Sequence, residues 1–286
     1  MPSTRTSPAT FAIGGDLSVR RLGFGAMRIV GPGVWGPPAD RELALAVCRR
    51  AVELGVQLID IADSYGPHTS EELLRDALAP YPDDLVIATK AGLIRPASGD
   101  WVAACEPERL MACCDASLTR LGMEQIDLYQ LHTVDRKVPL ADSVQAFANL
   151  RAAGKVRHVG LSNVTVEQIE AARAIVPIAT VQNRYSVADR GSEAVLEYCE
   201  RENIGFIPWF PLAAGNLAEA GGVVAEVAAE LEATTSQVAL AWLLARSPVM
   251  LPIPGTGSLA HLEENLAAAD IELTDDQFAR IDSARF

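Results

Sequence analysis

The 286-residue sequence contains no uninterrupted apolar run approaching eighteen residues, so it offers no segment typical of a membrane span. Its first fifteen residues lack the basic stretch and apolar stretch of a secretion signal. Cysteine is scarce and odd in number: five residues include the adjacent Cys113 and Cys114, a spacing that suits neither a disulfide framework nor a Cys-x-x-Cys zinc site. We therefore expect a cytoplasmic protein without disulfides, membrane span or metal ion.

Positive charge is also in short supply. The chain has 24 Lys and Arg residues against 37 Asp and Glu residues, which gives a formal net charge of -13. Such a chain repels nucleic acid and anionic lipid, so we expect neither as a partner, and a phosphate-bearing ligand must be held by local features. Only three residues are lysine, which makes Lys90, at the end of an aliphatic stretch, conspicuous.

The composition is otherwise that of an ordinary globular chain, with 49% hydrophobic and 21% charged residues. No Pro/Ser-rich linker, charge block or low-complexity tract marks a boundary, so we predict a single domain over residues 1–286. Eight short segments rich in β-branched and aliphatic residues are predicted as strands: Arg21–Phe24, Gln57–Ile61, Leu85–Thr89, Ile126–Leu131, Val156–Gly160, Thr180–Gln182, Gly205–Trp209 and Met250–Ile253.

Helical patterns lie between these strands. Ala39–Leu54 carries apolar residues at helical spacing. The start signal Thr-x-x-Glu or Thr-x-x-Gln occurs at Thr69, Thr165, Thr234 and Thr274. Eight strands alternating with helices predict an α/β fold with a parallel sheet, and its closed form is the (β/α)8 TIM barrel.

Two additions to the barrel are predicted at the ends of the chain. Ala9–Ile13 and Leu17–Arg20 flank Gly14 and Gly15, a turn signal that predicts an N-terminal β-hairpin closing the barrel bottom. After the eighth strand, Thr274 opens one extra C-terminal helix.

Polar residues follow three consecutive predicted strands at their carboxyl ends, where the active site of a parallel barrel lies. They are Asp60, with Tyr65 five residues later, Lys90 and His132. Singly, each side chain is more often structural: a helix cap, a packed aromatic, a rim lysine or a core histidine. Together they converge on one volume, which favours a catalytic role.

This set of side chains makes a proton donor. A phenol titrates near ~10, and a neighbouring ammonium lowers that pKa by stabilising the phenolate. Lys90 is predicted to do this for Tyr65, with Asp60 holding the lysine in place. An imidazole at His132 would orient a carbonyl oxygen and share its developing charge.

The four residues, in the runs LIDIADSYG, VIATKAG and LYQLHTVD, resemble the Asp-Tyr-Lys-His tetrad of the aldo-keto reductase family, in the same order at successive strand ends. The resemblance extends along nearly the whole chain. It implies hydride transfer from a nicotinamide cofactor to the carbonyl carbon of a small aldehyde or ketone, with Tyr65 as general acid.

Further runs, VGLSN, VQNRYS and FIPWFPL, match the family's nicotinamide site. The resemblance implies that Ser162, Asn163 and Gln182 bind the carboxamide and that Trp209 stacks on the ring. The other implied cofactor contacts are Gly25 and Met27 beneath the ring, Leu212 to Gly215 along the pyrophosphate, and Gly255, Thr256, Ser258, His261, Glu264 and Asn265 at the adenosine phosphate.

The adenosine-phosphate segment departs from the family in one respect. Many NADPH-preferring members carry Lys or Arg after the Gly-Thr pair, where this chain has Gly257, and His261 is the only basic residue in the segment. NADPH is the expected cofactor, and use of NADH stays open. Backbone N–H groups at the helix start near Ser258 would still bind an anion.

Gly31 to Gly36 spell G-x-G-x-x-G, but Pro32 has no N–H to offer and two prolines delay the next helix, so a dinucleotide turn is excluded. We interpret this stretch as an active-site loop in which Trp35 faces the substrate. Asp63 and Asp135 are expected to be solvated loop acids and Asp127 a structural strand acid. Asp60 with Asp127 supports a rival hypothesis, a barrel glycosidase with two strand-end carboxylates.

Within the family, GPGVWGPP and DSYGPH are similar to bacterial pyridoxal reductase-like members, which implies reduction of pyridoxal to pyridoxine. Alternative hypotheses are reduction of a sugar or secondary-metabolite ketone, and a barrel that binds nucleotide as a redox sensor without catalysis. The sequence predicts no oligomeric state.

Overall fold

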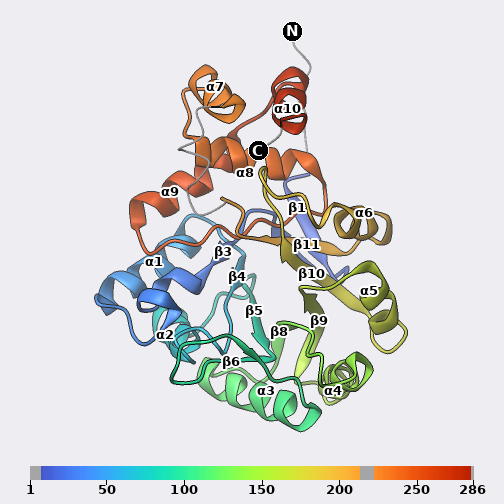
Figure 1. The fold of residues 1–286 in the computed structure, drawn as a ribbon. Helices are drawn as coiled ribbons and strands as arrows, with labels where there is room; N and C mark the ends of the chain where they lie inside the picture. The colour runs from blue at the N-terminus through green and yellow to red at the C-terminus, as the bar shows by residue number, and fades with distance from the viewer. Residues whose placement is uncertain (1–7, 213–221, 285–286) are drawn as a thin grey trace.

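The computed structural model describes residues 8–212 and 222–284. Seven strands form one parallel sheet in the order β11-β10-β9-β8-β5-β4-β3. Figure 1 shows the strands of this sheet curling around the centre of the molecule. The strands are β3 Phe24–Gly25, β4 Leu58–Asp60, β5 Val86–Ala91, β8 Ile126–Leu131, β9 Val156–Ser162, β10 Ile178–Arg184 and β11 Gly205–Trp209.

The eighth predicted strand closes the barrel without forming a regular strand. Leu251 N–H donates to Phe206 O of β11, and on the other side Gly23 N–H donates to Pro252 O at 2.9 Å. The segment thus joins β11 to the start of β3. Pro252 and Pro254 lack N–H groups, which removes the donors that a regular ladder at this position needs.

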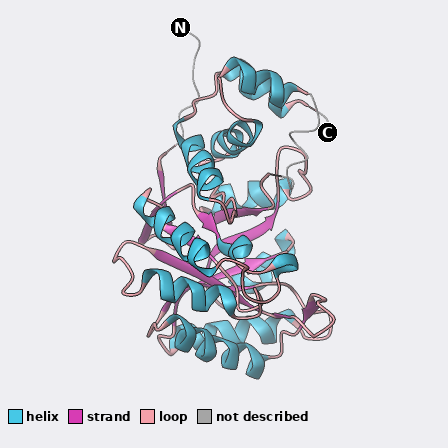
Figure 2. Ribbon diagram, turned by 90° about the vertical axis from the view of Figure 1, so that its left-hand side faces the viewer, coloured by secondary structure: helices cyan, strands magenta, loops and turns pink. Residues whose placement is uncertain are grey.

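Helices surround the barrel, with the strands inside (Figure 2). Neighbouring helices contact each other in chain order from α1 to α6, and α8 contacts α7 and α9. The helices are α1 Arg41–Glu53, α2 Thr69–Leu78, α3 Pro107–Leu121, α4 Leu140–Ala152, α5 Val166–Arg173, α6 Glu193–Glu202, α7 Val223–Glu230, α8 Thr235–Arg246, α9 Leu259–Ala267 and α10 Asp275–Asp282, with short 3-10 turns η1 Ala26–Ile29, η2 Pro32–Val34 and η4 Ala268–Asp270.

The predicted helix starts are confirmed at three of the four threonines. Thr165, Thr234 and Thr274 each form a capping box with the glutamine three residues later. The prediction for Thr69 is wrong. His68 takes the cap position there, and Thr69 Oγ1 donates to Gly66 O instead, so the threonine ties the end of the preceding loop to the helix.

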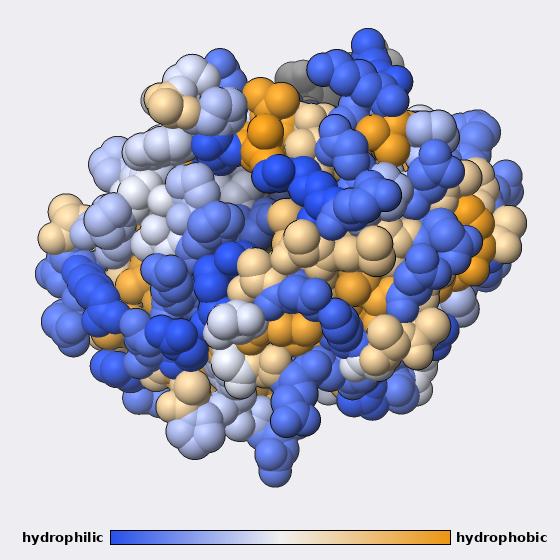
Figure 3. Space-filling model, turned by 90° about the horizontal axis from the view of Figure 1, so that it is seen from below, coloured by the Kyte–Doolittle hydropathy of each residue, from blue (hydrophilic) through white to orange (hydrophobic). Residues whose placement is uncertain are grey.

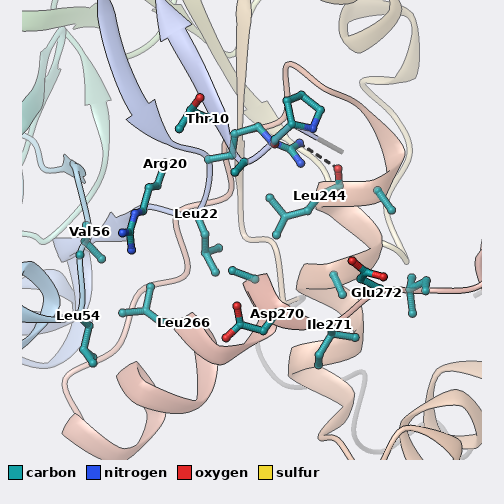
Figure 4. A pocket seen from close by; sticks show the side chains of 18 residues that line it. Thr10, Arg20, Leu22, Leu54, Val56, Leu244, Leu266, Asp270, Ile271 and Glu272 are labelled. Atoms are coloured by element: carbon teal, nitrogen blue, oxygen red, sulfur yellow. Dashed lines mark hydrogen bonds between the residues drawn. The ribbon is translucent and has the colours of Figure 1, made fainter. Parts of the chain in front are cut away.

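The predicted N-terminal hairpin is confirmed as β1 Thr10–Ile13 paired antiparallel with β2 Leu17–Arg20. Beside it, at the end of the barrel remote from the tetrad, lies a cavity of about 520 Å³ (Figure 4). Arg21 is buried in its wall and donates to Leu244 O and Ser247 O, at the carboxyl end of α8. The guanidinium therefore satisfies carbonyls that the helix itself leaves open.

One hairpin was not predicted. β6 Leu93–Ile94 pairs antiparallel with β7 Val102–Ala103 in the connection after β5. Its strands are too short to give a period-2 pattern in the sequence. It lies on the catalytic side of the barrel, since it directly follows the carboxyl end of β5.

The surface seen from below Figure 1, on the side of α3 and α4, is mostly hydrophilic with smaller hydrophobic areas between the polar side chains (Figure 3). Among the described residues, no helix combines the length and the apolar character that crossing a membrane requires. All five cysteines are free thiols.

Candidate active site

The four predicted catalytic residues lie together at the carboxyl ends of neighbouring strands. Asp60 ends β4, Lys90 lies in β5 beside it, and His132 follows β8. Lys90 Nζ donates to Asp60 Oδ2 at 2.5 Å, to Ile61 O at 2.9 Å and to the Tyr65 hydroxyl at 3.3 Å. These contacts occupy all three ammonium protons of Lys90.

Burial dominates the electrostatics of this group. Lys90 is 0% exposed and Asp60 2% exposed. Burial acts to lower the pKa of Lys90, but the Asp60 carboxylate and the Tyr65 hydroxyl outweigh it, so the pKa is raised and the ammonium stays charged. A buried ion pair of this kind is stable only with its remaining hydrogen bonds satisfied.

The pKa of Tyr65 differs from the expectation. Burial raises it, and this effect exceeds the opposing effect of the Lys90 charge, so the net pKa lies above that of an ordinary phenol. The expected net lowering is therefore wrong for the protein without ligand. The phenol is held protonated at neutral pH, as a proton donor must be before reaction.

His132 is a neutral imidazole at physiological pH. Burial and the nearby Lys90 charge lower its pKa well below the usual value. Its ring lies edge-on to the Tyr65 ring with centroids 5.9 Å apart, and Ser64 Oγ lies 3.4 Å from Nδ1. A neutral ring beside the phenol can donate one N–H to an oxygen but is too weak a base to compete for the Tyr65 proton.

Two amides hold Asp60 in place. Gln130 Nε2 and Gln182 Nε2 donate to Asp60 Oδ1 at 3.0 and 2.8 Å. The sequence did not single out Gln130, although a polar amide two residues before His132 in a predicted barrel strand was an available signal. Gln182 was expected only as a cofactor residue, and the structure shows that it also fixes the carboxylate that holds Lys90.

The expected carboxamide residues form a connected group beside the tetrad. Asn163, in left-handed backbone conformation with φ 59°, donates from Nδ2 to His132 O and to Ser162 Oγ. Its Oδ1 accepts from Trp209 Nε1 at 3.0 Å. Asn163 therefore links the histidine to the aromatic ring expected to stack on the nicotinamide.

A cavity starts at Asp60 and Tyr65 and runs to Gly255. Its walls combine one amide with aromatic and apolar side chains, which suits a flat ring that carries an amide, as nicotinamide does. At Gly25 and Gly255 the backbones approach so closely that a Cβ would lie 2.6 and 2.7 Å from carbonyl oxygens of the facing strand. The lining residues are Gly25, Met27, Arg28, Asp60, Tyr65, Gln182, Trp209, Phe210, Pro211, Leu212, Ile253, Pro254 and Gly255.

The expected adenosine-phosphate segment starts α9 as predicted. Ser258 is the N-cap and accepts from His261 N, and Thr256 Oγ1 accepts from Ser258 N at 3.0 Å. Glu264 accepts from Thr234 Oγ1, and Asn265 is buried. Gly215, expected along the pyrophosphate, lies outside the described residues.

An aromatic rim surrounds the mouth of the site. Trp101, from the unpredicted hairpin, meets the rings of Tyr65 and His132 edge-on at 6.3 Å each. The Arg95 guanidinium lies 3.9 Å from the Trp101 ring and 5.4 Å from the Trp35 ring. Trp35 was expected at this place, whereas Trp101 and Arg95 were not, because no local sequence pattern marks the hairpin that brings them to the mouth.

The other acids near the motif do not form a carboxylate pair with Asp60. Asp127 Oδ2 accepts from Ile87 N at 3.0 Å, near the start of β5, so its expected structural role is confirmed and the glycosidase arrangement is excluded. Asp63 and Asp135 are only 4% and 6% exposed, so the expectation of solvated acids is wrong. Asp63 turns away from the cavity toward Glu71 and Cys113, and burial with the Glu71 charge raises its pKa to about 7.

The fold is a (β/α)8 barrel with a buried Asp-Lys-Tyr group, a neutral histidine and a cavity suited to a nicotinamide ring at the carboxyl ends of its strands. These features together are typical of an oxidoreductase that acts on carbonyl compounds. The sequence model of the aldo/keto reductase family matches residues 21–285. The chain belongs to the aldo/keto reductase family.

The chain is similar in sequence or structure to three proteins over most of its length. It is 50% identical over 268 residues to an uncharacterized oxidoreductase of Schizosaccharomyces pombe, covering 94% of this chain and 87% of that one. It is 43% identical over 282 residues to pyridoxine 4-dehydrogenase of Escherichia coli, covering 96% and 98%. The crystal structure of an aldo-keto reductase from Klebsiella pneumoniae in complex with NADPH superposes with a TM-score of 0.82 at 28% identity, covering 97% and 95%.

Proposed function

We propose that this protein reduces pyridoxal to pyridoxine with NADPH. The observation that carries the chemistry is the contact of Lys90 Nζ with both Asp60 and the Tyr65 hydroxyl, which line the cavity. The substrate rests on the relation to pyridoxine 4-dehydrogenase and on the aromatic rim at the mouth. Five free thiols suit a reducing cytoplasm, where we place the protein.

NADPH, when bound, supplies a hydride from C4 of the nicotinamide to the carbonyl carbon. Tyr65 protonates the carbonyl oxygen from its buried hydroxyl. The Lys90 ammonium, 3.3 Å from that hydroxyl, stabilises the phenolate that remains. Asp60 keeps the ammonium charged and directed at the phenol, and the two glutamine amides keep Asp60 in position.

His132 orients the carbonyl. In the tautomer in which Nδ1 accepts a hydrogen bond from Ser64 Oγ, the imidazole hydrogen is on Nε2 and is available to the substrate oxygen. Because its pKa is lowered, the ring is neutral and acts as a hydrogen-bond donor, whereas a charged imidazolium would be a competing acid. His132 and Tyr65 thus divide the work of binding and protonating one oxygen.

The nicotinamide end of the cofactor would be held by Trp209, Ser162, Asn163 and Gln182. Gln182 Nε2 is occupied by Asp60 and Asn163 Nδ2 by His132 O. Gln182 Oε1 accepts no hydrogen bond from the described residues, so it is the free acceptor for the carboxamide NH2. Gly25 and Met27 line the cavity from the opposite side.

The rim favours a flat substrate. Trp101 meets the two rings of the tetrad edge-on, and Trp35 is 39% exposed on the other side of Arg95. Indole faces bind planar rings by stacking, and pyridoxal carries its aldehyde directly on an aromatic ring.

The proposal is tested with a panel of carbonyl compounds, each assayed with NADPH and with NADH by absorbance of the reduced nicotinamide. We expect the highest kcat/KM for pyridoxal, with other aromatic aldehydes next. Preference for a sugar ketone or another aliphatic ketone would overturn the substrate. Tight nucleotide binding without turnover of any compound would show a sensing barrel and overturn the enzymatic function.

A further inference from the structure

The segment expected to hold the adenosine phosphate of the cofactor contains no lysine or arginine. Between Gly255 and Asn265 the sole basic side chain is His261, and the whole chain carries a net charge of -13. A dinucleotide cofactor brings a pyrophosphate, and NADPH adds a 2′-phosphate. A negatively charged protein needs a local cation to hold these groups as well as backbone N–H donors.

Arg28 comes to this segment from a different part of the chain. It lies in η1, directly after β3, whose Gly25 N–H bonds to Pro254 O of the closing segment. The Arg28 stem lies against Gly255, because a Cβ there would be 3.7 Å from Arg28 Cγ. At Gly257 a Cβ would be 3.0 Å from Arg28 O.

The same residue lines the cavity that holds the tetrad. Arg28 lines the cavity together with Gly25 and Gly255, and Asp60 and Tyr65 line it as well. Ser258, three residues after Gly255, caps α9 and accepts from His261 N, so the N–H groups of Leu259 and Ala260 have no acceptor within the helix. Arg28 and the start of α9 therefore both lie close to Gly255.

The Arg28 guanidinium is exposed and makes no hydrogen bond or ion pair with any described residue. Other arginines are engaged: Arg50 with Glu53 and Glu263, and Arg21 with three carbonyls. An unpaired guanidinium at a cofactor cavity binds phosphate without first breaking an ion pair, and its planar fork matches two phosphate oxygens.

We propose that Arg28 is the cation that binds a phosphate group of the nucleotide cofactor and sets the affinity of this protein for it. This inference rests on the proposed use of a nicotinamide dinucleotide and adds a residue that lies outside the segment from Gly255 to Asn265. The pyrophosphate and the 2′-phosphate share the chemistry, and the choice of nucleotide separates them.

The test measures dissociation constants of NADPH and NADH by quenching of tryptophan fluorescence, without substrate, for the wild type, Arg28→Gln and Arg28→Lys. Loss of a charge-assisted contact is expected to weaken binding by about 10-fold or more, with partial recovery in Arg28→Lys. If Arg28→Gln weakens the binding of NADPH alone, Arg28 binds the 2′-phosphate. If it weakens the binding of both nucleotides equally, Arg28 binds the pyrophosphate. The salt dependence of binding should become shallower in Arg28→Gln.

Arg201→Gln is the matched control, since Arg201 is an exposed arginine at the end of α6 and is not among the residues that line the cofactor cavity. Its nucleotide affinity is expected to equal that of the wild type. Unchanged affinities for both nucleotides in Arg28→Gln would overturn the assignment of Arg28 alone. A wild type that binds neither nucleotide would overturn both this inference and the proposed function.

Discussion

The Lys90 ammonium has no exposed surface, so every one of its protons must find an acceptor within the protein. Three acceptors satisfy its protons, and one of them is the phenol it must activate. Removing Asp60 would leave an uncompensated buried charge, which typically costs about 3–5 kcal/mol. The ion pair is therefore both a structural requirement and the source of the field that stabilises a Tyr65 phenolate.

Tyr65→Phe keeps the ring and removes the proton donor. We expect kcat to fall about 100-fold or more, in the range for loss of a general acid, while the dissociation constant of NADPH changes less than about threefold. Steady-state kinetics and fluorescence titration measure the two quantities on the same preparation. A variant with near wild-type kcat would show that another group donates the proton.

The ionisation of Asp63 makes the free energy of unfolding depend on pH. Its Oδ1 is buried without a hydrogen-bond partner, and burial with the Glu71 charge raises the pKa to about 7, from an ordinary value near ~3.9. The folded state thus binds more protons than the unfolded state between about pH 4 and pH 7, so this group lowers stability progressively as the pH rises through that window.

Asp63→Asn removes the ionisation and with it this pH dependence. The variant should gain stability relative to the wild type on going from pH 5 to pH 8, with an upper bound of about 3 kcal/mol, because about two pKa units of the shift lie within this range. Urea unfolding at the two pH values measures the difference. Parallel changes in both proteins would mean that Asp63 ionises normally in the folded state.

At the scale of elements, the mouth of the site is built by two segments that Arg95 joins. Arg95 donates to Gly33 O and Val34 O of the loop after β3, and to Gly99 O within its own hairpin connection. Its guanidinium also stacks on Trp101. The loop in turn bonds to Gly66, next to Tyr65. Arg95 therefore positions both tryptophans relative to the tetrad.

Arg95→Gln should loosen the rim without touching the tetrad. We expect KM for pyridoxal to rise about 10-fold with kcat nearly unchanged, because a cation–π contact and three hydrogen bonds at the mouth are lost while the hydrogen bonds among Asp60, Lys90 and Tyr65 remain. KM for a small linear aldehyde should stay the same, and Arg201→Gln should leave both substrates unaffected. Equal changes for the two aldehydes would contradict a role in ring selection.

The elements show how far the sequence can predict this fold. β8 and β11 have the predicted bounds, and three capping boxes form as expected, because strand composition and cap chemistry are local. The segment at Pro252 was predicted as a regular strand, which it is not, and the β6–β7 hairpin was not predicted at all. Their geometry is set by hydrogen bonds to distant strands and by packing over the site, which no local pattern contains.

The same division holds for the candidate site. Asp60, Tyr65, Lys90 and His132 were predictable because strand ends in a parallel barrel must converge. Gln130, Trp101 and Arg95 were not identified, since each contacts residues far from it in the chain. Arg28 was not identified because only the folded chain brings it beside Gly255. The expectation that Asp63 and Asp135 are solvated was wrong for a related reason. Loop acids are usually solvated, and only the three-dimensional packing shows which ones are buried.

At the scale of the whole molecule, we predict a single cooperative unfolding transition, as one domain requires. NADPH binding at the carboxyl ends of the strands should raise the free energy of unfolding by about 2.7 kcal/mol at 100 times its dissociation constant. A reductant should not shift the transition, since all five thiols are free. Calorimetry with and without each addition measures these effects, and two separate transitions would contradict the single domain.

The most direct test of the account is to follow the hydride itself. The wild type is incubated with pyridoxal and NADPH deuterated at the transferred position of nicotinamide C4, and the product is analysed by mass spectrometry. The account predicts pyridoxine carrying one deuterium on the former aldehyde carbon, formed in equal amount to the NADP produced, and almost none from Tyr65→Phe in the same time. Unlabelled alcohol, or oxidised cofactor without alcohol, would contradict it.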